Sequence, residues 1–120
     1  MPRTNVPIVT NSASGAATGA GTTADPTNDH VVDLAGYPLE NVTIRLTNTN
    51  GTDRVATIVA GDSPPALSAG LGNLDVTVPA TSGDVTIAGL ESARYLQADG
   101  TIHIDLAASY AGAVRVTRPA

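Results

Sequence analysis

Residues 41–47 read NVTIRLT, and this stretch decides the fold class. Val42, Ile44 and Leu46 alternate with polar residues, so in an extended chain they point to one face while their neighbours point to the other. A period of two residues is typical of a strand that is buried on one side only. The same alternation returns in residues 101–106, TIHIDL. The pattern predicts an all-β fold whose strands each present one apolar face.

Outward from this stretch, turn residues separate further β-prone segments. Asn50-Gly51 and Asp99-Gly100 are tight-turn signals, and the first predicts a hairpin between residues 41–47 and a return strand at 54–60. The remaining predicted strands are 30–34, 74–78, 84–87, 93–97 and 113–117. About eight short strands at such spacing favour an antiparallel β-sandwich, jelly-roll-like, or a small barrel.

The inward positions of these strands predict a purely aliphatic core, because the chain has no Phe and no Trp. Aliphatic side chains bury less area than aromatic ones, so oligomerisation or docking would help to stabilise the domain. The predicted core residues are Val42, Ile44, Leu46, Val76, Val78, Val85, Ile87, Ile102, Ile104, Leu106, Val114 and Val116.

Residues 1–28 predict an extended N-terminal arm, and residues 29–120 a single sandwich domain. Residues 11–28 are almost entirely Gly, Ala, Ser and Thr, which offer no large apolar side chain to a core. We expect the arm to be mobile in the free protein. Its β-prone part is predicted to order by pairing with a neighbouring protein, the alternative being a disordered tail. These predicted partner-binding residues are Asn5, Val6, Ile8, Val9 and Thr10.

Charge and composition exclude several classes of function. Six Arg and no Lys stand against 11 acidic residues, a net charge of -5, and the arginines form no basic run. We therefore expect no nucleic-acid binding and no attraction to anionic membranes. No window approaches the ~18 apolar residues of a membrane-spanning helix. The absence of Cys excludes disulfides and thiolate metal sites.

A search for catalytic chemistry finds no arrangement of nucleophile and base. There is no Gly-x-Ser-x-Gly elbow, and the two histidines, His30 and His103, lie far apart in sequence. His103 and Asp105 share a strand face and could chelate a cation, but zinc usually takes at least three protein ligands. A solvated strand face is the expected environment of His103. We therefore predict no enzyme activity, no cofactor and no small-molecule substrate.

Residues 61–72, GDSPPALSAGLG, predict a long loop because consecutive prolines cannot continue a strand. Its leucines either tuck beneath the loop or face a partner. Pro64, Pro65, Leu67 and Leu71 are therefore a second candidate set of partner-binding residues. Carbohydrate binding is disfavoured, since no Trp and only three Tyr are available to stack on sugar rings.

Three segments resemble small head-decoration, or minor capsid, proteins of tailed bacteriophages that infect high-GC bacteria. They are DPTNDH at 25–30, VTIRLTNT at 42–49 and, most specifically, LESARYLQADGTIHID at 90–105, within a similarity that spans residues 25–118. The resemblance implies a β-sandwich made in the host cytoplasm and fixed to the outer capsid surface of the virion. The implied partners are the major capsid protein and neighbouring copies of the chain. Alternatives are a phage neck or tail structural protein, or a bacterial adhesion or carbohydrate-binding sandwich.

Overall fold

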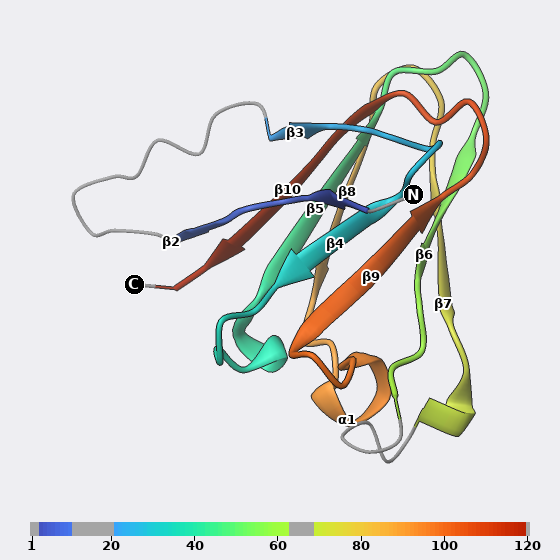
Figure 1. The fold of residues 1–120 in the computed structure, drawn as a ribbon. Helices are drawn as coiled ribbons and strands as arrows, with labels where there is room; N and C mark the ends of the chain where they lie inside the picture. The colour runs from blue at the N-terminus through green and yellow to red at the C-terminus, as the bar shows by residue number, and fades with distance from the viewer. Residues whose placement is uncertain (1–2, 11–20, 63–68, 120) are drawn as a thin grey trace.

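The computed structural model describes residues 3–10, 21–62 and 69–119 (Figure 1). Strands make up 46% of the chain and helices 9%, which confirms the predicted all-β class, and the sheets do not close into a barrel. The strands are β1 (Thr4–Asn5), β2 (Ile8–Thr10), β3 (Thr22–Thr23), β4 (His30–Asp33), β5 (Thr43–Asn48), β6 (Arg54–Ile58), β7 (Leu74–Val78), β8 (Gly83–Ala88), β9 (Thr101–Leu106) and β10 (Gly112–Arg118). Helical turns lie at Leu39–Asn41, Ala69–Leu71 and, as α1, Ser92–Tyr95.

The strands form two sheets in a sandwich-like arrangement. Sheet A has the order β1-β4-β9-β6-β7, and sheet B has the order β2-β10-β5-β8, with β3 also paired to β10. Both sheets are mixed, because β1 pairs with β4, and β2 with β10, in parallel. The expected purely antiparallel sandwich was therefore wrong at the N-terminal strands, while the remaining pairs are antiparallel.

The core lies between the inner faces of the two sheets. Ile44, Leu46, Ile102 and Ile104 are fully buried, as the alternation of their strands predicts. Val42, Val78, Leu106, Val114 and Val116 are also buried. The other predicted core residues, Val76, Val85 and Ile87, are only partly buried because they lie on the edge strands β7 and β8.

The predicted hairpin around Asn50-Gly51 was wrong. β5 belongs to sheet B and β6 to sheet A, so residues 49–53 carry the chain from one sheet to the other. The buried side chain of Asn48 stabilises this crossing: its Nδ2 donates to the carbonyls of Thr52 and Val78, at 3.1 Å each, and its Oδ1 accepts from the Asn50 amide at 2.9 Å. The chain bends at residues 50–52, but the strands on either side pair elsewhere.

The predicted strand at 93–97 was also wrong, since Ser92–Tyr95 forms the helical turn α1. The Glu40 carboxylate accepts hydrogen bonds from the amide and the hydroxyl of Ser92, at 2.9 and 3.0 Å. These bonds satisfy a donor at the start of the turn, and the Tyr95 side chain is buried beneath it. Glu40 is distant in sequence, so the local pattern could not reveal this cap.

The N-terminal segment differs from the expected free arm. β1 and β2 pair with strands of the same chain, and the Val6 amide donates to the Val31 carbonyl at 2.9 Å. Between the two strands the chain passes from sheet A to sheet B, and the Val6 side chain is only 1% exposed. Val6 thus belongs to the hydrophobic core of its own domain.

We expect Val6→Ala to lower the free energy of unfolding by roughly 1.5–3 kcal/mol, because it removes buried methyl groups and leaves a cavity. The matched control is Val9→Ala, since Val9 is only half-buried and should cost less than about 1 kcal/mol. Urea denaturation followed by circular dichroism measures both. Equal, small effects would show that Val6 does not close the core.

Candidate functional site

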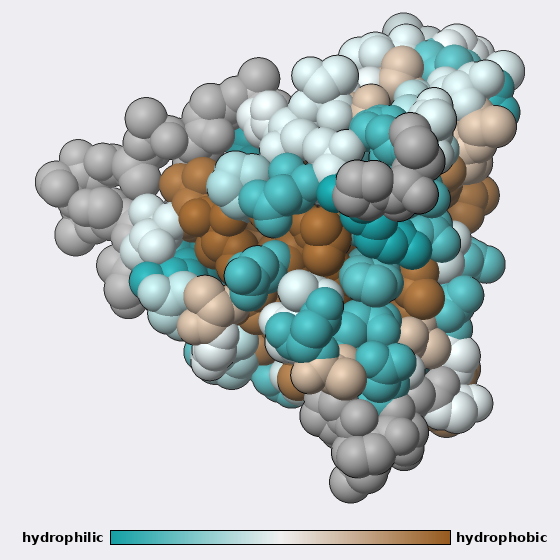
Figure 2. Space-filling model, viewed as in Figure 1, coloured by the Kyte–Doolittle hydropathy of each residue, from teal (hydrophilic) through white to brown (hydrophobic). Residues whose placement is uncertain are grey.

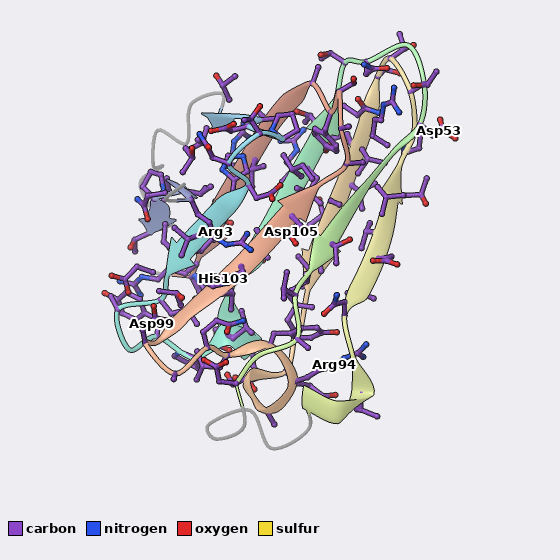
Figure 3. The ribbon with its side chains drawn as sticks, turned by 45° about the vertical axis from the view of Figure 1, so that its right-hand side comes forward. Arg3, Asp53, Arg94, Asp99, His103 and Asp105 are labelled. Carbon is purple, nitrogen blue, oxygen red and sulfur yellow. The ribbon has the colours of Figure 1, made fainter. Side chains whose placement is uncertain are left out.

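The outer face of sheet A gathers the charged residues labelled on β9 and at the N-terminus in Figure 3. Arg3 Nη1 lies 2.5 Å from Asp105 Oδ1 and donates to the His30 carbonyl at 3.3 Å. His103 occupies the outer face of β9, as predicted, but is half-buried rather than fully solvated. Burial, and next the positive charge of Arg3, lower the pKa of His103, so its imidazole is neutral at pH 7.

Within residues 3–10, 21–62 and 69–119, no group of three or more His, Asp or Glu side chains is placed to hold a metal ion. Figure 2 shows apolar surface near the centre of this side of the molecule, broken up by polar side chains. Among the helices in the described ranges, none has the length and apolar character needed to cross a membrane.

His30 is fully buried at the start of β4 and links two parts of the N-terminal region. Its Nε2 lies 3.0 Å from the Asp25 amide, which can only donate, so Nε2 accepts. Nδ1 therefore carries the proton and donates to the Thr4 carbonyl at 3.2 Å. Burial lowers the pKa of His30 against the smaller opposing effects of the Thr4 hydrogen bond, Asp25 and Asp29, while Arg3 lowers it further. A neutral imidazole thus holds β1 to the loop before β4.

Hydrogen bonds fix both ends of the predicted partner-binding loop. On one side, the Gly61 amide donates to the Arg94 carbonyl at 2.8 Å, and the Asp62 carboxylate accepts from the Ala98 amide at 2.8 Å. Gly61 has no room for a side chain, since a Cβ there would lie 2.2 Å from the Leu96 carbonyl oxygen. The base of the loop is therefore packed tightly against α1 and the residues that follow it.

Arg94 holds the other end of this loop, a role that the sequence did not indicate. Its Nε donates to the Gly72 carbonyl at 3.0 Å and its Nη2 to the Asn73 carbonyl at 3.1 Å. Asn73 Oδ1 in turn accepts from the Ala60 amide at 2.7 Å, which joins the two ends. The only sequence signal was an arginine in a segment predicted as a strand, which does not distinguish a structural role from a surface charge.

Of the predicted loop residues, Leu71 is 68% exposed at the end of the helical turn Ala69–Leu71. Pro64, Pro65 and Leu67 lie outside the described residues. Of the predicted arm residues, Val6 is buried, Ile8 and Val9 are half-buried, and Asn5 and Thr10 are exposed. Of the loop set only Leu71 is described, and Figure 1 shows the helical turn that it ends well away from β2 of the arm.

No family model, no curated protein and no solved structure matches this chain. Function must be inferred from the chain's own residues.

A shallow pocket of about 140 Å³ lies beside the end of β10, lined by Tyr37, Pro38, Asn41, Val42, Arg118 and Pro119. The Arg118 guanidinium covers the Tyr37 ring at 3.6 Å from its centroid and donates to the Tyr37 hydroxyl at 2.9 Å. These contacts make the pocket part of the packing between residue 37 and the last strand.

The buried neutral His30 predicts loss of stability in acid. Because its pKa in the folded protein lies below the ordinary 6.5, the unfolded chain binds the proton first as the pH falls. Stability from this group is therefore fully present above pH 6.5 and declines below it, by about 1.4 kcal/mol for each unit of pKa shift. The urea concentration at the midpoint of unfolding should therefore decrease as the pH is lowered from 7.5 to 5.

His30→Gln should be less stable at pH 7 and show a shallower decline below pH 6.5. His103→Ala is the comparison, because the pKa of His103 is lowered as well, and the decline that remains in this variant is the part that does not depend on His103. If the stability of His30→Gln fell with pH as steeply as that of the parent chain, the acid sensitivity would not come from His30.

Proposed function

We propose that this chain is a non-catalytic virion structural protein that binds the outside of a bacteriophage head and stabilises it, with the major capsid protein as its partner. Support comes from the resemblance of residues 25–30, 42–49 and 90–105 to head-decoration proteins. The all-β, sandwich-like fold agrees with that resemblance.

The observation that carries the proposal is the exposed Leu71 on a loop with a fixed base. Single exposed leucines are common, but this one follows a loop whose two ends are held by Arg94 and Asn73. An apolar side chain that is already positioned loses little conformational freedom on docking. Leu71 therefore supports a role in protein–protein contact.

The structure favours the loop over the arm as the first contact with the shell. Val6 and Ile8 pack against the core of their own domain, so withdrawing them to bind a capsid would expose apolar surface. Pairing of Asn5–Thr10 with a neighbouring protein stays a prediction. The exposed Leu71 can dock without any such rearrangement.

Modest affinity at each site is sufficient for this role. A shell offers many equivalent positions, and ligands that bind only the assembled state stabilise it by mass action. An aliphatic loop contact on an acidic, Cys-free domain meets this requirement without a pocket or a cofactor.

The proposal is tested by locating the chain on particles of the phage that encodes it. Immunogold labelling with antibodies raised against the purified chain should decorate the head evenly. Label confined to the neck or tail, or absent from particles, would contradict a head-decoration role.

Leu71→Ser should weaken co-sedimentation with undecorated heads by roughly tenfold or more, as expected for losing a buried leucine. Val55→Ser is the matched control, because Val55 is also exposed, at 37%, but lies near the start of β6, whereas the loop follows its end. His103→Ala should also bind normally. Normal binding by Leu71→Ser would exclude Leu71 as the shell contact and remove the observation that carries the proposal.

A further inference from the structure

The strand β8 ends sheet B with a free edge. It pairs with β5 on one side, and within the described parts of the chain no strand pairs with its other side. A free edge presents a row of amide and carbonyl groups that pair readily with another strand. Proteins usually protect such edges with Pro, Lys or a bulge, but residues 83–88 read GDVTIA and contain neither Pro nor Lys.

The side chains of β8 leave apolar surface uncovered at this edge. Val85 and Ile87 point toward the core and are only partly buried. Their neighbours across the strand pair, Leu46 and Ile44 on β5, are fully buried. A further strand beside β8 would cover this surface and add to the apolar area removed from water.

The charge on β8 does not oppose pairing. Asp84 is its one ionisable residue, and Arg45 on β5 contacts both of its carboxylate oxygens, with Nε 2.8 Å from Oδ1. On the opposite edge strand β7, the carboxylate of Asp75 accepts from the Thr57 hydroxyl, and the strand runs into Pro79. The other edges, β1, β2 and β3, have only two or three residues each. Among the described edges, β8 is therefore the longest and the least protected.

We infer that a second copy of this chain pairs with β8, antiparallel and about a two-fold axis at Thr86. This register places Thr86 opposite Thr86 of the second copy, Val85 opposite Ile87, and Asp84 opposite Ala88. Apolar residues then meet apolar residues, the threonines can bond to each other, and no like charges stand directly opposite. The pairing is self-complementary, which is the property that selects a second copy over an unrelated strand.

This self-association is independent of the proposed capsid role. Each copy carries a net charge of -5, so long-range repulsion opposes pairing and is screened by salt. The full-length protein should be a dimer by sedimentation velocity, and the dimer should tighten as salt is raised. A chain that remains monomeric up to its solubility limit at high salt would overturn the inference.

Charge substitutions test the register. Ala88→Asp would set two carboxylates opposite each other at both ends of the interface, and should weaken the dimer by about tenfold. Ala88→Lys should tighten it, because the lysine would face Asp84 of the second copy. Thr77→Asp on β7 is the control, since it adds the same charge as Ala88→Asp at an exposed position of the other long edge. It should change the dissociation constant of the dimer by less than about twofold. Equal weakening by Ala88→Asp and Thr77→Asp would overturn the assignment to β8.

The absence of native Cys allows a direct distance test. In Thr86→Cys the two thiols of a dimer would lie opposite each other, so mild oxidation should give a disulfide-linked dimer. Thr77→Cys should remain largely monomeric under the same conditions. Faster cross-linking of Thr77→Cys would assign the interface to β7 and overturn the inference. Thermal melts of each variant, compared with the parent chain, establish that the fold is retained.

Discussion

The structure depends on closing the edge of a two-sheet core that contains no Phe and no Trp. The expected purely aliphatic core was wrong in one respect, because Tyr95 and Tyr110 are buried in it among the aliphatic side chains. Such a core in a domain of this size has little buried area in reserve, so an open edge is costly. The segment from Thr4 to Thr10 closes it by pairing first with β4 and then with β10, and the side chain of Val6 fills the space between. His30 completes the closure, because its buried imidazole accepts from the Asp25 amide and donates to the Thr4 carbonyl.

The opposite side of the sandwich is formed by β7 and β8, where Leu74, Val76, Val85 and Ile87 are only partly buried, although Val78 is fully buried. One side is thus sealed by the chain's own N-terminus, and the other retains a strand edge that can pair. The loop that ends in Leu71 offers a third kind of surface, an exposed apolar side chain above a hydrogen-bonded base. The proposed shell contact uses the loop, and the inferred self-association uses β8.

Polar groups in this fold serve mainly to position the backbone. Asn48 holds the crossing between the sheets, Glu40 caps α1, and Arg94 holds the loop carbonyls. Each bonds to backbone amide or carbonyl groups that the strand pairing leaves without partners. The two histidines, which were considered from the sequence for catalysis or metal binding, also have structural positions. His30 is a buried link between two segments, and His103 is a half-buried strand residue.

By itself the sequence determined the all-β class and the inward faces of β5 and β9, because strand alternation is a property of neighbouring residues. Ile44 and Ile104 are buried for this reason. Only the tertiary structure decided which strands pair, that Asn50-Gly51 turns between sheets, and that Ser92–Tyr95 is helical under the Glu40 cap. It also decided that Val6 belongs to the core and that the arginine at 94 holds a loop. Each of these outcomes depends on groups far apart in the chain, whose proximity no local pattern encodes.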